Sequence, residues 1–448
     1  MTPGVPAWHA VLDGTAQGLL AGEDPAAIDA VVQALQGRLG QQLPQAAPGF
    51  AMHMSRPPHG IAWLAQALAS ALQPNNHNRD AGAACSEMEL EAIAALGRMV
   101  GWPQAVGHLC SGGTVANLEA MWVARERLGP GATVLITDHA HYAHRRNARL
   151  LGLRCEVLPA DAAGRWDLAA LDERLAAAGP CIVVATLGTT AVGAVDPLHA
   201  LAARRHGGMQ LLVDAAYGGY HTLALGPHDA ARPAFDALPQ ADAIVIDPHK
   251  HGLQPLGCAA VLYPDGRVLA TFRHDAPYAY FDAKPALPLG QLGLEGSRIG
   301  ATAAALWATL QLCPLVPAGR FAAGLRAGLD TARDWYCRLA ADARWQVMPT
   351  PPDLDIVVWR PVSAPAGAVR QAAAGLGLYL GEVRVPARCF GVTAEEDVAA
   401  LRAVWMKSLD AAQRTACWVL LEQALSSCGS GLCGSGFSRD SLPATDRG

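Results

Sequence analysis

Residues 244–263 read IVIDPHKHGLQPLGCAAVLY, and this stretch decides the fold. Two apolar runs, Ile244 to Ile246 and Cys258 to Tyr263, are bounded by Gly and Pro, which is typical of short buried strands. The first run is followed three and four residues later by His249 and Lys250. A lysine at the end of a buried strand needs a partner or a chemical task, because removing its ammonium group from water is costly. The stretch therefore predicts a buried sheet with a functional amine at its edge.

The composition predicts a globular protein with a large core. The chain has 448 residues, 51% of them hydrophobic, and carries 34 basic and 39 acidic side chains for a net charge of −5. No basic block points to nucleic acid or a membrane surface, and no run reaches the ~18 apolar residues that span a bilayer. The N-terminus lacks the features of a signal peptide, and the 11 cysteines lack metal-site or disulfide spacing. We expect a cytoplasmic protein with reduced thiols and a small-molecule partner.

Strand-like runs alternate with helical segments through the middle of the chain. The runs are ATVLITD (132–138), CIVVATL (181–187), MQLLVDA (209–215), ADAIVID (241–247) and CAAVLY (258–263). Such runs predict an α/β fold whose mostly parallel sheet is covered by helices on both faces. Ser86 and Glu89 have the spacing of a capping box that begins a helix.

The pattern divides the chain into four parts. We expect a helical arm without strands in residues 1–60, a large domain in 61–315, a smaller C-terminal α/β domain in 316–424 and a disordered Gly/Ser-rich tail in 425–448.

Polar residues follow the predicted strands where a ligand would bind, since ligands of parallel sheets lie at the carboxyl ends of strands. These residues are Asp214, His249 with Lys250, Thr189 with Thr190, and His139 with His141, while SGGTVAN (111–117) precedes a helix. Each alone is commonly a structural cap or turn. Together they match one ligand: an amine forms a Schiff base with an aldehyde, a helix N-terminus binds phosphate, and a carboxylate keeps a ring nitrogen protonated. Pyridoxal 5'-phosphate presents all three groups.

At these residues the sequence resembles the group II pyridoxal-phosphate-dependent amino acid decarboxylases, which have the aspartate aminotransferase fold, fold type I. The resemblance covers about residues 50–405 and rests on SGGTVANLEA, TLGTT, VDAAYGG, DPHK followed by PLGCAAVLY, and LEGSRIG. It implies a lyase of amino acid metabolism that releases carbon dioxide from an L-amino acid and forms the amine.

The resemblance also implies roles for single residues. Lys250 would bind the cofactor covalently, and His249 would contact the phosphate or the bound cofactor. Asp214 would pair with the pyridinium nitrogen, with Ala216 packed under the ring. The remaining cofactor contacts would be Gly112, Gly113 and Thr114 around the phosphate, Thr190 near the ring hydroxyl, and His141 stacked on the ring close to the leaving carboxylate.

Two further expectations concern the neighbouring subunit and a loop. Ser297 resembles a residue that reaches the phosphate of the partner subunit, which implies a homodimer with shared active sites. The Pro-rich segment 273–290 matches a loop that closes over the substrate. We expect Tyr278 or Tyr280 on this loop to protonate the carbanion after carbon dioxide leaves.

The predicted substrate wall is polar. Positions that aromatic amino acid decarboxylases fill with apolar residues hold His53, Met54, Ser55 and Arg56, then Asn75 and His77. Because an aromatic substrate would leave such groups buried without partners, we expect an L-amino acid with a polar or anionic side chain. An aromatic substrate such as tyrosine is the alternative.

Three other interpretations remain. An aminotransferase or a carbon–carbon lyase shares the fold, and Arg384 or Arg388 could then bind a substrate carboxylate. A scaffold without cofactor is disfavoured by the joint presence of Lys250, Asp214 and the glycines. We expect no metal at the cluster His139, His141 and His144, because no further ligand stands at suitable spacing.

Overall fold

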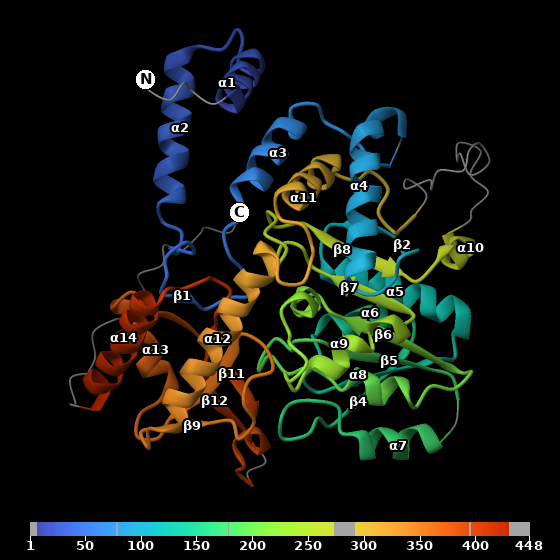
Figure 1. Ribbon diagram of the computed structural model, residues 1–448, viewed down its shortest axis with the longest axis vertical. Helices are drawn as coiled ribbons and strands as arrows, with labels where there is room; N and C mark the ends of the chain where they lie inside the picture. The colour runs from blue at the N-terminus through green and yellow to red at the C-terminus, as the bar shows by residue number, and fades with distance from the viewer. Residues whose placement is uncertain (1–6, 78, 178, 273–291, 394–395, 430–448) are drawn as a thin grey trace, which may run out of the picture.

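The computed structural model describes residues 7–77, 79–177, 179–272, 292–393 and 396–429. A seven-stranded sheet lies at the centre of the large domain (Figure 1). Its order is β2-β8-β7-β6-β5-β3-β4, and only β8 is antiparallel to the other strands. The strands are β2 (Val106–Cys110), β3 (Thr133–Thr137), β4 (Arg154–Leu158), β5 (Cys181–Thr186), β6 (Met209–Asp214), β7 (Ala243–Ile246) and β8 (Ala259–Tyr263).

Helices cover both faces of this sheet. Along β5, Val183 packs into one hydrophobic core with Leu96, and the next residue, Val184, packs into a second core with Met121. Successive side chains of a strand point to opposite faces, so each face needs its own cover. The helices are α3 (Gly60–Ser70), α4 (Arg79–Met99), α5 (Gly113–Leu128), α6 (Ala143–Leu150), α7 (Leu168–Ala176), α8 (Leu198–Ala202), α9 (Arg232–Asp236), α10 (Leu269–Phe272) and α11 (Gly300–Leu312). The α/β prediction, with a mostly parallel sheet between helices, is confirmed.

A second sheet and three helices form the smaller domain. The sheet order is β1-β11-β12-β10-β9, all antiparallel except β1 with β11. Its core contains four buried tryptophans, Trp335, Trp345, Trp359 and Trp405, each at most 5% exposed. The elements are β1 (Phe50–Ala51), α12 (Arg320–Ala340), β9 (Trp345–Val347), β10 (Ile356–Pro361), α13 (Ala366–Gly375), β11 (Tyr379–Pro386), β12 (Asp397–Val404) and α14 (Ala411–Gly429).

The N-terminal arm projects from the body of the protein (Figure 1). It consists of α1 (Ala7–Leu19) and α2 (Pro25–Leu39), and none of the residues of α2, all of which the structure describes, is buried. Asp24 caps α2, because its side chain accepts a hydrogen bond from the backbone N–H of Ala26. The expectation that residues 1–60 hold no strand is wrong: β1 pairs with Tyr379 and Leu380 and adds an edge strand to the small sheet.

Two other expectations are corrected. Ser86 and Glu89 do not cap a helix, since α4 begins earlier, at Arg79; the buried Glu89 carboxylate instead accepts hydrogen bonds from Leu109 N and from Arg298. The boundary of the tail at residue 425 falls inside α14, which continues to Gly429 because Leu425 packs into the small-domain core. Residues 430–448 lie outside the described part of the chain.

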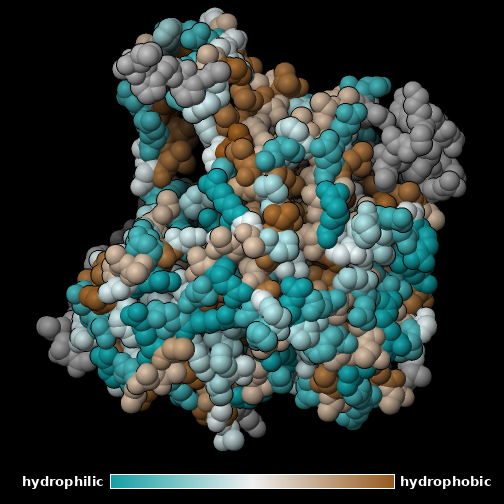
Figure 2. Space-filling model, viewed as in Figure 1, coloured by the Kyte–Doolittle hydropathy of each residue, from teal (hydrophilic) through white to brown (hydrophobic). Residues whose placement is uncertain are grey.

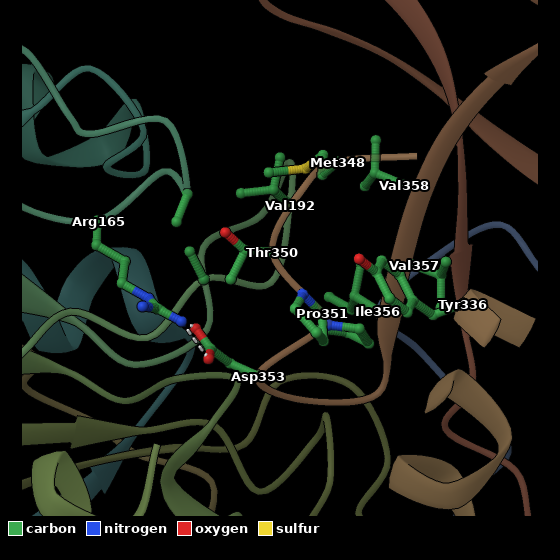
Figure 3. A pocket seen from close by; sticks show the side chains of 13 residues that line it. Arg165, Val192, Tyr336, Met348, Thr350, Pro351, Asp353, Ile356, Val357 and Val358 are labelled. Atoms are coloured by element: carbon green, nitrogen blue, oxygen red, sulfur yellow. Dashed lines mark hydrogen bonds and ion pairs between the residues drawn. The ribbon is translucent and has the colours of Figure 1, made fainter. Parts of the chain in front are cut away.

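One short segment, Asp353 to Asp355, fixes the small domain on the large one. The Asp353 carboxylate accepts hydrogen bonds from the Arg165 guanidinium and from Val195 N, at 3.1 Å and 2.9 Å from its Oδ2 (Figure 3). Beside this ion pair lies a small cavity of about 20 Å³, lined also by Val192 and Met348. None of the helices in the described ranges is long and apolar enough to cross a membrane.

Candidate active site

A cavity of about 640 Å³ lies at the carboxyl ends of β5, β6 and β7. This is the edge of a parallel sheet at which ligands are expected to bind. The cavity brings together most of the residues that the sequence singled out, from segments far apart in the chain. These are Met54, Gly112, Gly113, Thr114, His141, Thr190, Asp214, Ala216, His249 and Lys250.

Asp214, the last residue of β6, is held in place by two hydrogen bonds. His144 Nε2, in the first turn of α6, donates to its Oδ2 at 2.9 Å, and Ala216 N donates to its Oδ1 at 3.1 Å. Burial alone would raise the pKa of Asp214, but the hydrogen bond from His144 and the nearby Lys250 outweigh it and hold the pKa well below its usual range. The cavity therefore contains a fixed negative charge at neutral pH.

Lys250 lies beside a second carboxylate. Its Nζ is 3.1 Å from Asp247 Oδ2, and the turn is closed by a backbone hydrogen bond from Lys250 N to Asp247 O. His249 Nε2 is 3.6 Å from the same carboxylate oxygen, while its Nδ1 donates to Cys258 O. Asp247 is 3% exposed, and its Oδ1 has no hydrogen-bond partner within the described ranges.

The start of α5 faces the cavity. Gly112 is its N-cap, and no described side chain makes a capping hydrogen bond there. Asn117 and Asn147 donate to the carbonyl groups of Gly113 and Thr114 and so fix the backbone of this first turn. A Cβ on Gly113 would lie 2.7 Å from Asp247 Oδ2, so only glycine fits, whereas a Cβ on Gly112 would meet nothing within 4 Å. An uncapped helix start beside open space is suited to bind an anion.

His141 and Thr190 also line the cavity. The Nδ1 of His141 accepts a hydrogen bond from Ala143 N, and its ring packs on Tyr142 at 4.3 Å between centroids. Burial lowers the pKa of His141, so the imidazole is mainly neutral at pH 7. The Thr190 carbonyl accepts a hydrogen bond at 2.5 Å from Arg402, a residue of β12 in the small domain.

Several predicted residues do not line this cavity. His53 is exposed and lines a neighbouring groove of about 480 Å³ with Arg402, and Arg56 donates to Met406 O. Asn75, His77 and Ser297 form a separate group, in which Asn75 Nδ2 donates to Ser297 Oγ and His77 N donates to Asn75 Oδ1. Tyr278 and Tyr280 lie outside the described residues.

The arginines that an aminotransferase could use are engaged elsewhere. Arg384 donates to Asp397 O, and Arg388 donates to Ala160 O and pairs with Asp138. Neither residue lines the cavity with Lys250.

The roles of three residues at or beside the site were missed by sequence reasoning. Asp247 stands inside the DPHK motif itself, three positions before the lysine, and His144 stands three positions after His141 in HAHYAH. Both residues stand in motifs already noted in the sequence. The role of His144 depends on Asp214, which is distant in sequence, and the role of Asp247 depends on the turn that brings it to Lys250. Arg402 follows an ordinary strand pattern and carries no local signal.

Comparisons with known proteins agree with the geometry. The pyridoxal-dependent decarboxylase conserved domain matches residues 19–360. A probable L-tyrosine/L-aspartate decarboxylase of Methanothermobacter thermautotrophicus is 33% identical over 228 residues, which are 50% of this chain and 61% of that protein. A probable L-aspartate decarboxylase of Halobacterium salinarum is 34% identical over 260 residues, which are 58% of this chain and 69% of that protein. The chain thus matches about two thirds of the length of these relatives.

Solved structures show the same fold. Oryza sativa TDC with PLP and tryptamine gives a TM-score of 0.76 at 21% identity, covering 95% of this chain and 93% of that chain. Mouse CSAD in apo form gives a TM-score of 0.75 at 20% identity, covering 94% and 98%. The expected family and cofactor are confirmed: the chain belongs to the pyridoxal-dependent decarboxylase family.

Proposed function

We propose that this protein is a pyridoxal-phosphate-dependent L-amino acid decarboxylase, a lyase that releases carbon dioxide and forms the amine. One observation carries the proposal: Lys250, the fixed Asp214 carboxylate and the glycine start of α5 line a single cavity in a chain of this family. Each of these groups matches one functional group of the cofactor. The three groups come from separate segments of the chain and meet in this cavity.

The residues present fit the cofactor. Asp214 would hold the ring nitrogen, Lys250 would form the covalent bond, and Gly112, Gly113 and Thr114 would hold the phosphate at the uncapped helix start. The partnerless Oδ1 of buried Asp247 shows that this end of the cavity has unused hydrogen-bonding capacity. When bound, pyridoxal phosphate supplies an electron sink for the bond that breaks at the substrate α-carbon.

The residues of the chain provide charge, orientation and protons. His144 holds the Asp214 carboxylate in one orientation, and the low pKa of Asp214 keeps it ionised, so it favours a protonated ring nitrogen. Asp247 holds the Lys250 amine at the cavity wall. The neutral His141 ring offers a flat surface on which the cofactor ring can stack. We expect Tyr278 or Tyr280 to return the proton, and His249 and Thr190 to contact the cofactor, as the resemblance implies.

The proposed substrate is an L-amino acid with a polar or anionic side chain. Besides the probable L-tyrosine/L-aspartate and L-aspartate decarboxylases above, relatives include an L-2,4-diaminobutyrate decarboxylase of Rhizobium meliloti and the human cysteine sulfinic acid decarboxylase, 35% and 30% identical. Arg402 is a basic group beside the cavity: it donates to Thr190 O at the cavity wall and to Met52 O, is 9% exposed, and its Nε has no hydrogen-bond partner in the described structure. Of the wall predicted from the sequence, Met54 alone lines the cavity, so the preference rests on Arg402 and on these relatives. An aromatic substrate such as tyrosine is the rival.

We also propose a cytoplasmic homodimer with shared active sites. Apolar side chains are exposed along α2 and near α3: Val31, Val32, Leu35, Leu39, Trp63 and Leu72. Figure 2 shows hydrophobic surface along these helices. A second copy of the chain would bury it. Asn75, His77 and Ser297, which do not line the cavity of their own chain, would then be available to the cavity of the partner.

The test is product analysis with purified protein and added pyridoxal phosphate. Aspartate, glutamate, 2,4-diaminobutyrate, tyrosine, DOPA and tryptophan are supplied in turn, and amine, carbon dioxide and keto acid are measured. We expect an amine and carbon dioxide in equal amounts from one of the first three. Stoichiometric keto acid would indicate an aminotransferase instead, and a preference for the aromatic substrates would overturn the substrate assignment alone.

A further inference from the structure

Next to the lysine, three enclosed side chains from separate elements meet. His221 lies in the 3-10 helix η1 (Gly219–Leu223), His251 directly follows Lys250, and Asp355 precedes β10. Their exposed fractions are 0%, 2% and 1%, so solvent does not reach them. This cluster is distinct from the groups that line the cavity.

The three side chains face one another. His251 Nε2 is 3.4 Å from Asp355 Oδ2, His221 Nε2 is 3.7 Å from Asp355 Oδ1, and the imidazole rings lie 4.6 Å apart at 83°. One possible ligand atom from each residue lies within 4.8 Å of the other two. Tyr217 donates a hydrogen bond of 2.6 Å to Asp355 Oδ1, which orients the carboxylate and leaves Oδ2 free.

Within the described residues, five polar atoms of the cluster have no hydrogen-bond partner. Both ring nitrogens of His221, both ring nitrogens of His251 and Asp355 Oδ2 are buried without a partner among the residues that the structure describes. Buried polar atoms are almost always satisfied, so several unsatisfied atoms within one cluster indicate a bound group. His144, in contrast, uses one ring nitrogen for Asp214.

We propose that His221, His251 and Asp355 bind one divalent transition-metal ion, for which zinc is the best match. Two imidazoles and a carboxylate are ligands that zinc takes, and tetrahedral ligand atoms about 2.1 Å from the ion lie about 3.4 Å apart. The 3.4 Å between His251 Nε2 and Asp355 Oδ2 agrees with this geometry, and His221 Nε2 lies 3.7 Å from the second oxygen of the same carboxylate. A water molecule would complete the set, and Tyr217 would orient the carboxylate ligand.

The ion would act as a structural clamp. It would join the segment after Lys250, the 3-10 helix that follows the Asp214 strand, and the segment that docks the small domain. The orientation of the lysine-bearing turn would then depend on the small domain. The proposal is independent of the reaction that the enzyme catalyses, because it concerns only the content and place of the metal.

The first experiment measures metal in the untagged holoenzyme. After gel filtration, elemental analysis by plasma mass spectrometry should find about one zinc per chain. His221→Gln and His251→Gln should each lose most of it, while His199→Gln, an exposed histidine of α8, serves as the matched control and should keep it. Wild-type protein that holds no metal even after incubation with zinc would overturn the proposal, as would equal metal in all variants.

A second measurement does not depend on the variants folding. X-ray absorption at the zinc edge of the wild-type holoenzyme should show nitrogen and oxygen ligands with the scattering of two imidazoles and no sulfur. Removal of zinc with dipicolinate should lower the melting temperature, and zinc, but not magnesium, should restore it. Sulfur ligands, or a melting temperature that does not change on removal of zinc, would contradict this site.

Discussion

Asp214 ends β6, Asp247 follows the neighbouring parallel strand β7, and both line the same cavity, yet their surroundings differ. Asp214 has both oxygens committed, one to His144 and one to a backbone N–H. Asp247 has one oxygen beside Lys250 and His249, and its other oxygen has no partner within the described ranges. The Asp214 carboxylate is thus held in one orientation and stays ionised. Asp247 instead pairs with the Lys250 amine, which must leave this pair before it can react.

The largest expected effect comes from removing the amine of Lys250, which pairs with Asp247. Lys250→Ala should lower amine formation by more than about 10³-fold, because no other group can form the covalent bond. The chain has three lysines, Lys250, Lys284 and Lys407, so borohydride reduction and peptide mapping discriminate well. Burial lowers the pKa of Lys407 to about 8, which makes it the rival nucleophile of the described part. A label on Lys407 would contradict the assignment.

The second prediction removes the fixed charge. Asp214→Asn should lower turnover by about 10²-fold or more, since a neutral amide cannot hold the ring-nitrogen proton. The matched control is Asp172→Asn, which breaks an exposed ion pair with Arg204 and should leave turnover unchanged. Steady-state kinetics with saturating cofactor provide the measurement, and near-normal turnover of Asp214→Asn would refute its role.

The same substitution should make the difference in unfolding free energy between variant and wild type depend on pH. The pKa of Asp214 is lower in the folded protein than in the unfolded chain, so its contribution to stability is complete above the ordinary pKa of about 3.9 and is lost as the pH falls further. At neutral pH the variant should lose on the order of 2 kcal/mol of unfolding free energy. Denaturant titrations at pH 7 and in acid should show this gap between variant and wild type shrinking in acid. A gap that is independent of pH would contradict the linkage.

The third prediction concerns the second carboxylate. Asp247→Asn should speed cofactor attachment about tenfold, because the amide still reaches Lys250 but no longer stabilises its ammonium form, and only the neutral amine attacks the aldehyde. Stopped-flow absorbance after addition of pyridoxal phosphate measures this rate. If this variant lost as much turnover as Asp214→Asn, the two carboxylates would not differ in the way that their contacts indicate.

The smallest expected effects come from Gly112 and Gly113 at the start of α5. Gly113→Ala should cost about 1–3 kcal/mol of stability, because its Cβ would overlap Asp247 Oδ2. Gly112→Ala should keep the stability of the apoprotein and weaken cofactor binding, because its Cβ meets only open space. Thermal melts and cofactor titrations distinguish these outcomes, and equal stability losses would show that the close contact at Gly113 is absent.

The strands that were predicted correctly are those with uninterrupted apolar runs. Two strands of the large sheet were missed for opposite reasons. β2 contains His108, a polar residue that is buried only because Glu119 pairs with it at 2.9 Å, and this pairing raises the pKa of His108 against the effect of burial. β4 is an edge strand, and none of its residues is buried. Neither feature can be read from a window of sequence.

The site was predictable where a motif is local. The lysine, the glycines and Asp214 stand in short patterns at strand ends, and all line one cavity. The residues of the polar substrate wall were assigned by counting positions back from the segment around Ser86 without gaps. Such counting could not show that Arg56 donates to Met406 O or that His53 lies in another groove. The contribution of Arg402 depends on how the two domains pack, which no local pattern encodes.

The segment that joins the domains has a consequence for how the protein unfolds. Asp353 accepts hydrogen bonds from Arg165 and Val195 of the large domain, and Asp355 accepts one from Tyr217 of the same domain. The next residue begins β10, which pairs with β12 in the small sheet. Loss of either domain therefore removes partners from the other, so the two domains should lose structure cooperatively. A calorimetric scan should give a single transition, and catalytic inactivation should follow it without a separate step in which the small domain opens alone.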